Sequence, residues 1–131
     1  MALELEGFHH VAIIVSDYAR SKAFYTDILG AKILAETYRA ERESYKLDLQ
    51  FPDGSQIELF SFPQAPERLS YPEACGLRHL AFKVKDVEDC VEQLAKYHII
   101  CEAVRFDELT KMKYTFFKDP DNLPIELYQS Y

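Results

Sequence analysis

Two glutamates stand at matching places in two short apolar runs of the sequence. Glu58 lies in the run Gln56-Ile-Glu-Leu and Glu126 lies in the run Pro124-Ile-Glu-Leu, and each run follows a Pro-Asp turn. A carboxylate between Ile and Leu in a strand is costly to bury unless it is paired or binds a metal ion. Because this arrangement occurs twice, we expect a common partner for both carboxylates.

Two histidines provide that partner. His10 lies in the first apolar segment, and His79 occupies the matching place in the second half at an offset of 69 residues (79 − 10). The glutamates have nearly the same offset, 68 residues (126 − 58). His9 aligns with Arg78 instead, and strand alternation points it to the opposite face. The repeat therefore selects His10 and His79.

Four residues that obey one repeat predict a mixed nitrogen and oxygen site for a divalent transition metal. Imidazole suits Zn, Ni, Co or Fe(II), and carboxylates favour a harder ion than a cysteine site would bind. Four protein ligands leave two positions of a six-coordinate ion for water or substrate oxygens. A single His or Glu in a strand is more often structural, so the shared offset is what favours the metal site. The predicted ligands are His10, Glu58, His79 and Glu126.

The segments around these residues predict an α+β fold of two tandem βαβββ modules. The first half predicts a strand, a helix and three further strands, over residues 8–15, 18–29, 31–40, 45–51 and 56–60. The second half predicts the same order, over residues 77–84, 87–97, 99–106, 114–118 and 124–128. Three prolines mark the connection between the halves as a linker. We therefore expect one domain over 1–131, with modules at about 7–62 and 77–129 and a linker at 63–76.

Two further groups of residues are interpreted as structural. Lys46, Asp48 and Gln50 alternate with apolar residues, which is typical of the solvated face of a half-buried strand. The aromatic residues near the glutamates are expected in the core or in the wall of a cavity, namely Phe60, Tyr114, Phe116 and Tyr128.

Composition restricts the class of protein. The chain has 131 residues, of which 48% are hydrophobic and 14% aromatic, as in a folded globular protein. Its net charge of −7 argues against nucleic-acid binding, which needs a basic surface. No apolar run has membrane-spanning length and no signal peptide is apparent, so we expect a cytoplasmic protein without a membrane partner. The three cysteines form no CxxC pair and are interpreted as reduced thiols.

Residues 8–128 resemble the vicinal oxygen chelate superfamily, and within it the glyoxalase I-like proteins. The pattern is also similar to the short bacterial glyoxalase-like proteins of the YaeR type. The resemblance implies a curled mixed sheet around one divalent ion, Ni or Zn first and Co, Mn or Fe next, and it implies a homodimer. It rests on the motifs His10-Val-Ala, Phe24-Tyr-Thr-Asp-Ile-Leu-Gly, Ile57-Glu-Leu, His79-Leu-Ala-Phe and Asp119-Pro-Asp-Asn-Leu-Pro-Ile-Glu-Leu.

The resemblance also implies roles for the two glutamates. In glyoxalase I the metal binds both oxygens of the glutathione–methylglyoxal hemithioacetal and stabilises an enediolate, while a glutamate ligand moves a proton between adjacent carbons. By position, Glu126 matches the main base and Glu58 matches its partner. The sequence departs from that family at Ile14, where glyoxalase I has Arg, and at Phe62, where it has Asn. Both lost residues bind glutathione, so the departures argue against glutathione as a co-substrate.

The resulting expectation is a lactoylglutathione lyase-like metalloenzyme, a lyase or isomerase that acts through an enediolate on a small α-oxo or α-hydroxy compound. Two alternatives share the fold. Epimerases of the methylmalonyl-CoA type tend to have Gln where Glu58 stands, and ring-cleaving dioxygenases use two His and one carboxylate. A non-catalytic binder of the antibiotic-sequestering type is the third alternative, although such proteins typically lack the metal ligands that this chain retains.

Overall fold

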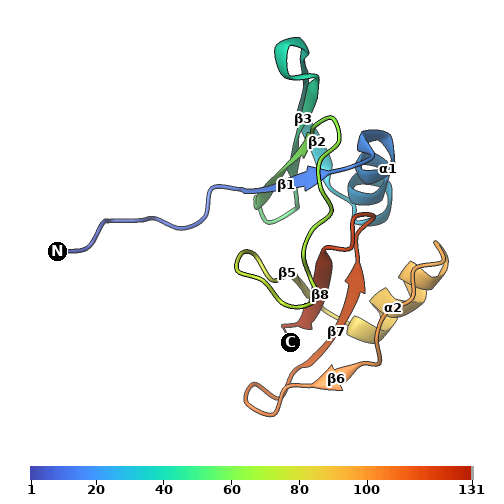
Figure 1. The fold of residues 1–131 in the computed structure, drawn as a ribbon. Coiled ribbons are helices and arrows are strands. Elements are labelled where there is room, and N and C mark those ends of the chain that lie inside the picture. Colours follow the sequence, from blue (N-terminus) through green and yellow to red (C-terminus); the bar gives the residue numbers. More distant parts are fainter. Residues whose placement is uncertain (131) are drawn as a thin grey trace. The chain divides into compact units, whose positions relative to one another are not determined.

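The chain folds into two compact units, Met1–Pro66 and a second unit that begins at Glu67, in a computed structural model that describes residues 1–130. Each unit contains one four-stranded sheet and one α-helix (Figure 1). The order strand, helix and three strands occurs in both units, which confirms the expected α+β fold of two tandem βαβββ modules. No helix of the described part is long and apolar enough to cross a membrane.

The sheet of the first unit has the strand order β1-β4-β3-β2. The first and last strands of the module, β1 (Val11–Val15) and β4 (Gln56–Ser61), pair in parallel, with β1 at one edge of the sheet. Strand β3 (Ser44–Gln50) runs antiparallel to β4, and β2 (Lys32–Arg39) forms the outer edge. Helix α1 (Tyr18–Ala23) connects β1 to β2 and packs against β4.

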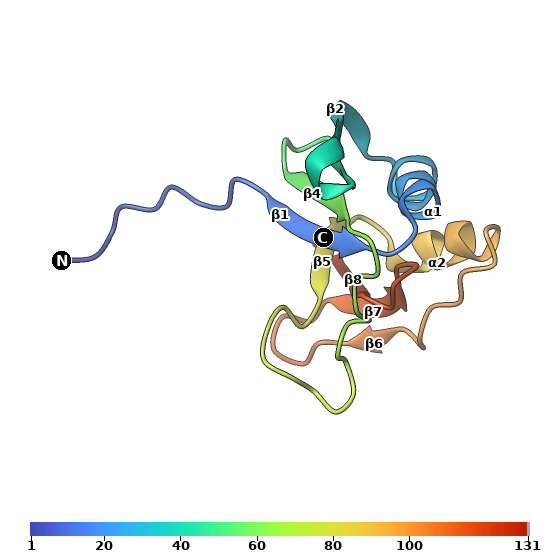
Figure 2. The ribbon, with the colours of Figure 1, turned by 45° about the horizontal axis from the view of Figure 1, so that its top comes forward.

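The sheet of the second unit repeats this topology as β5-β8-β7-β6 (Figure 2). Strands β5 (Leu80–Val84) and β8 (Pro124–Gln129) pair in parallel, and β7 (Lys113–Lys118) runs antiparallel to β8. Strand β6 (Arg105–Phe106) is a short edge strand, and helix α2 (Val87–Ala95) packs against β7 and β8.

Alternation along the strands divides each sheet into a core face and an open face. In β4, Ile57 and Leu59 are almost fully buried, whereas Glu58 between them points to the opposite face. In β8, Ile125 and Leu127 are buried in the same way around Glu126. The Ile and Leu residues on either side of each glutamate therefore pack in the core, and the carboxylates lie on the opposite face of the sheet.

The first helix differs from the predicted span of 18–29. Its α-helical part ends at Ala23, and Phe24–Ile28 continues as a wider π-helical turn. This turn buries two adjacent aromatic side chains, Phe24 at 6% exposure and Tyr25 at 0%. Gly30, the expected stop, has a φ of 79°, which a glycine adopts at low cost.

The strands also begin and end differently from their predicted spans. Strands β1 and β5 start three residues later than expected, and of the segment 99–106 only β6 pairs as a strand. Before β6 the chain is held to β7 through Glu102, whose backbone N–H donates to the carbonyl of Phe116 and whose carbonyl accepts from the Thr115 hydroxyl. These isolated bonds keep the segment near the sheet without a ladder.

The three cysteines are free thiols, as the sequence indicated. Cys75 is exposed, whereas Cys90 and Cys101 are half-buried. Burial raises the pKa of Cys90 and also that of Cys101, so both thiols stay protonated at neutral pH.

The two Pro-Asp turns have equivalent structures. In the first, the N–H of Phe51 donates to the carbonyl of Ser55, and in the second the N–H of Asp119 donates to the carbonyl of Leu123. Both pairs are related by the offset of the glutamates, 119 − 51 = 68 and 123 − 55 = 68. Each turn has one residue of positive φ, Gly54 at 92° and Asn122 at 66°. The turns thus set both hairpins in the same register.

Gly54→Ala is expected to lower the free energy of unfolding by about 1–2 kcal/mol, because a left-handed conformation brings Cβ close to the following carbonyl. No heavy atom lies within 4 Å of the Cβ position at Gly54, so the loss comes from the backbone alone. Gly54→Asn should lose less, since asparagine tolerates this region and Asn122 occupies the equivalent place. Chemical denaturation measures both losses. Equal losses in the two variants would contradict this explanation.

Candidate metal centre

In the first unit, β1 and β4 bring His10 and Glu58 together. His10 immediately precedes β1, and Ala12 of that strand is the parallel partner of Glu58. The Nε2 atom of His10 lies 3.5 Å from Oε1 of Glu58. The side chain of Glu58 is 13% exposed and that of His10 is 36% exposed, so the pair is shielded on the carboxylate side and open on the imidazole side.

The second unit builds an equivalent pair from His79 and Glu126. His79 immediately precedes β5, and Ala81 of that strand is the parallel partner of Glu126. Nε2 of His79 lies 3.4 Å from Oε1 of Glu126. The exposed fractions, 31% for the histidine and 15% for the glutamate, follow the same order as in the first unit. Both modules therefore position their predicted ligands by the same parallel strand pairing.

Each pair fits two ligands of one divalent ion. Metal–ligand bonds of about 2.0–2.2 Å place neighbouring donor atoms roughly 3.0–3.5 Å apart, depending on the coordination angle. Both observed nitrogen–oxygen separations fall in that range. Imidazole nitrogen with carboxylate oxygen is a donor set that Ni, Zn, Co, Mn and Fe(II) accept. Within residues 1–130 no group of three or more His, Cys, Asp or Glu is assembled, so the structure presents the predicted ligands as two pairs.

Two charged residues of β3 lie beside the first pair. Asp48 is the antiparallel partner of Glu58, and Nζ of Lys46 lies 3.5 Å from Oδ1 of Asp48 and 3.9 Å from Oε2 of Glu58. Both residues lie on the more solvated face of the half-buried strand, as expected, but the ion pairs of Lys46 with Asp48 and Glu58 were not predicted. Counting outward from the Pro-Asp-Gly turn would have placed Asp48 opposite Glu58.

The second pair has an aromatic surrounding instead. Phe116 is the antiparallel partner of Glu126, and the ring of His79 meets that of Phe116 edge-on at a centroid distance of 5.1 Å. Tyr114 and Tyr128 are partners one step further along the same face, with stacked rings. No lysine or arginine of the described residues pairs with Glu126. The two glutamates, equivalent in the repeat, therefore differ in their electrostatic surroundings.

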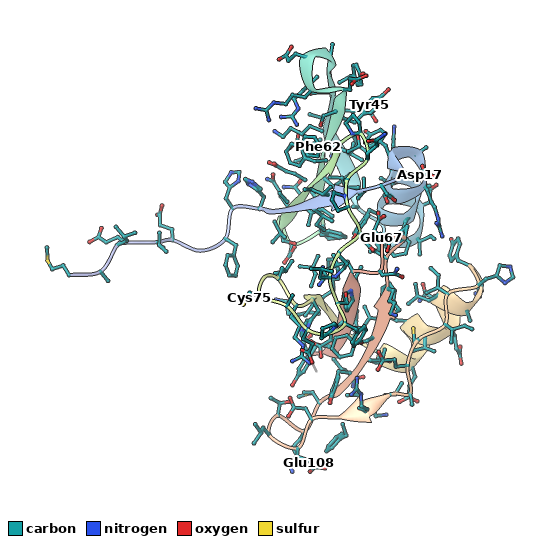
Figure 3. The ribbon with its side chains drawn as sticks, in the orientation of Figure 1. Asp17, Tyr45, Phe62, Glu67, Cys75 and Glu108 are labelled. Atoms are coloured by element: carbon teal, nitrogen blue, oxygen red, sulfur yellow. The ribbon has the colours of Figure 1, made fainter. Side chains whose placement is uncertain are left out.

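The loop between β6 and β7 (Glu108 in Figure 3) is tied to the same face through Tyr128. The Tyr128 hydroxyl donates to Oδ2 of Asp107 at 2.9 Å and contacts the hydroxyl of Thr110. The backbone N–H of Leu109 and then the Tyr128 hydroxyl lower the pKa of Asp107, which therefore remains ionised. This network fixes the orientation of Tyr128 two residues from Glu126.

The two departures from glyoxalase I lie near the first pair. Ile14 is the parallel partner of Phe60 and is 57% exposed. Phe62, labelled in Figure 3 where the chain leaves β4, stacks on Phe60 with ring planes 6° apart and centroids 6.3 Å apart. Apolar side chains therefore stand where the glutathione-binding Arg and Asn of glyoxalase I would stand.

Comparisons with known proteins place this geometry in a family. The sequence profile of the Glyoxalase/Bleomycin resistance protein/Dioxygenase superfamily matches residues 7–127. The chain is 54% identical to YaeR of Escherichia coli K12 over 97% of the chain and 98% of that protein. It is also 54% identical to YwkD of Bacillus subtilis 168 over 95% and 98%. Both relatives are described as uncharacterized proteins, and their similarity confirms the resemblance seen in the sequence.

Solved structures give the same result. The glyoxalase family protein from Enterococcus faecalis superposes with a TM-score of 0.89 at 45% identity, covering 96% of this chain and 99% of that one. The metallothiol transferase FosB of Staphylococcus haemolyticus is 29% identical over 95% of the chain and 84% of that protein. The fold is also that of the fosfomycin resistance protein FosX of Listeria monocytogenes, solved with Mn(II), at 19% identity and a TM-score of 0.74. With its profile match and its two-module structure, the chain belongs to the Glyoxalase/Bleomycin resistance protein/Dioxygenase superfamily.

Proposed function

We propose that the protein is a metal-dependent lyase or isomerase that acts through an enediolate on a small α-oxo or α-hydroxy compound. The observation that carries this proposal is the pair of equivalent contacts, His10–Glu58 and His79–Glu126, at matching positions of the two modules. Two donors are too few for a resident catalytic ion, which takes three or more protein ligands. We therefore assign all four residues to one divalent ion per chain, with Ni and Zn ahead of Co, Mn and Fe.

The ion, when bound, supplies Lewis-acid stabilisation of negative charge on two vicinal substrate oxygens. The chain supplies the proton transfer. Glu126 removes a proton from the substrate carbon next to the carbonyl and returns it to the adjacent carbon. Atoms and electrons balance without a co-reactant, because one C–H bond breaks and another forms while the hydroxyl proton moves to the former carbonyl oxygen.

The surroundings of the two glutamates support this division of roles. Glu58 lies 3.9 Å from the Lys46 ammonium group, and this attraction favours its staying in place as a ligand. Glu126 has Phe116 as its cross-strand partner and no cationic side chain paired with it among residues 1–130. A carboxylate that must loosen from the ion to take a proton moves more easily where no second cation holds it.

Activity on the glutathione–methylglyoxal hemithioacetal is expected to be weak or absent, because Ile14 and Phe62 replace two glutathione-binding side chains. The assay follows loss of hemithioacetal absorbance with protein loaded with Ni or Zn, alongside a panel of other α-dicarbonyl adducts. Turnover of one panel member would support the proposed reaction class. A catalytic efficiency on the glutathione adduct of roughly 10⁴ M⁻¹s⁻¹ or more would contradict the specificity prediction and restore glyoxalase I activity.

Metal-dependent transfer of a thiol to an acceptor is a second candidate. It is favoured by the similarity to the metallothiol transferase FosB, which extends over 95% of the chain. Measurement of thiol consumption by the metal-loaded protein, with fosfomycin among the acceptors, separates the two functions. Thiol loss that requires fosfomycin identifies thiol transfer, because enediolate isomerisation of a hemithioacetal requires an α-dicarbonyl compound and leaves the thiol in a thioester product.

We further propose that the protein acts as a homodimer in the cytoplasm on a small-molecule substrate, with neither nucleic acid nor membrane as a partner. The family resemblance supports the dimer, and light scattering during gel filtration measures it.

A further inference from the structure

The guanidinium group of Arg39 lies on the open sheet face of the first unit. Arg39 ends the edge strand β2 and is the antiparallel partner of Ser44. Its Cζ atom lies 5.0 Å from the ring centroid of Phe60 and 5.8 Å from that of Phe62, so the planar group stacks over both rings. Such stacking is worth about 0.5–2 kcal/mol, which holds the side chain in position without neutralising its charge.

The hydrogen-bonding capacity of this guanidinium is largely unused. Arginine has five N–H donors. Nη2 donates to the Ser44 hydroxyl at 2.9 Å, whereas Nε is buried and has no hydrogen-bond partner among the described residues. No carboxylate of residues 1–130 forms an ion pair with Arg39, although the neighbouring Lys46 contacts both Asp48 and Glu58. A half-buried cation with free donors is costly, and a bound anion would satisfy it.

The second unit provides an internal comparison. Arg105 of the edge strand β6 stacks in the same way, with its Cζ 5.1 Å from the ring centroid of Tyr114 and 5.4 Å from that of Phe116. Its Nη2, however, lies 3.1 Å from Oε1 of Glu102, so its charge is neutralised within the chain. The stacked arginine recurs in both units, but only the first lacks a carboxylate partner among the described residues.

Arg39 lies on the same face as the first His–Glu pair. The Arg39 guanidinium stacks on Phe60, which is two residues from Glu58 on β4. Alternate residues of a strand point to the same face and lie about 7 Å apart. A ligand with oxygens at the metal end and an anionic group several bonds away would span that distance.

We propose that Arg39, stacked on Phe60 and Phe62, forms an anion-binding subsite that takes a carboxylate or phosphate group of the substrate. The subsite adds a substrate class to the proposed function, and its role in turnover rests on that function. Binding of an anion by Arg39 does not require the metal ion. It would select compounds that carry negative charge away from their vicinal oxygens, and it would provide one cation in place of the lost glutathione anchors.

The test uses inorganic phosphate and acetate as probes with the full chain, stripped of metal and freed of chelator. Titration is followed by nitrogen-edited NMR of backbone amide signals, which every variant retains, and of arginine side-chain N–H signals. We expect the Arg39 Nε–H signal to shift in a saturable way. Arg39→Gln should weaken binding by roughly ten- to hundredfold, as expected when a charge-assisted hydrogen bond is lost. Arg105→Gln, the matched control, should bind both anions as the native chain does.

Arg39→Lys keeps the positive charge but loses the planar set of guanidinium N–H donors, so it separates the effect of charge from that of donor geometry. Because it keeps the cation, it is also less prone to misfold than Arg39→Gln. A loss in this variant smaller than in Arg39→Gln supports the subsite. Saturation by phosphate but not acetate assigns the subsite to phosphate groups, and the reverse assigns it to carboxylates. No saturable shift below about 10 mM, or equal binding by the native chain and Arg39→Gln, overturns the proposal. Metal content of the same samples, measured separately before stripping, reports on the proposed function independently.

Discussion

Glu126→Gln is expected to lower turnover of the substrate by about 10²–10⁴-fold, the usual cost of losing a general base. The amide retains an oxygen that can still coordinate, so the variant should keep part of its metal. It cannot accept the proton from carbon at neutral pH. The expectation follows from the aromatic surrounding of Glu126, where Phe116 is the cross-strand partner and no cation is paired with the carboxylate in the described chain. Turnover and metal content are measured on the same preparations.

Glu58→Gln is the matched control, since it makes the same change at the equivalent position of the other module. It should retain more activity than Glu126→Gln, because Glu58 is held beside Lys46 and is assigned a ligand role. If both variants lose activity equally while holding metal, the single-base assignment is wrong. The two glutamates would then act together as one proton shuttle.

The repeat made much of the fold and half of the site's geometry predictable. Glu58 and Glu126 were identified from the apolar residues on either side, and these are the residues that bury in the two cores. The residue immediately before each first strand is the histidine that the offset selected, and it contacts the glutamate of the last strand. Parallel pairing of the first and last strands is the physical reason why residues 48 positions apart in the first module (58 − 10) come together.

The charged neighbours could not be found in the same way. Alternation alone showed that Lys46 and Asp48 share a face, but it did not show that this face is the one with Glu58. That depends on the hairpin register set by the Pro-Asp-Gly turn. The position of the Arg39 side chain is harder still to predict, because the pairing of β2 with β3 shifts at a bulge between Ile33 and Ala35. A shift of one residue moves a side chain to the other face of a sheet.

Local chemistry explains the other differences. The spacing of apolar residues does not distinguish an α-helix from a π-helical turn. The wider π-helical turn allows both Phe24 and Tyr25 to be buried. The extended segment before β6 had apolar residues typical of a strand. It has no ladder partner for most of its length, so only Arg105–Phe106 pairs.

Removal of either histidine is expected to abolish tight metal binding. His10→Ala and His79→Ala each delete one of the four proposed ligands, so the affinity should fall by more than the roughly 10–100-fold that loss of an outer-shell partner costs. His98→Asn is the control, because His98 is exposed and lies outside the repeat. Its φ of 63° is one that asparagine tolerates, so this variant should fold and bind metal normally. A site that used only one His–Glu pair would respond to one alanine variant and not to the other.

The most direct measurement is the metal content of native protein purified without chelators, by elemental mass spectrometry. We expect one divalent ion per chain, and near-background content in both alanine variants. Added Ni or Zn should also raise the melting temperature of stripped native protein, since a ligand that binds the folded state stabilises it by mass action. Background metal in the native protein, together with no stabilisation by added Ni or Zn, would contradict the four-ligand centre.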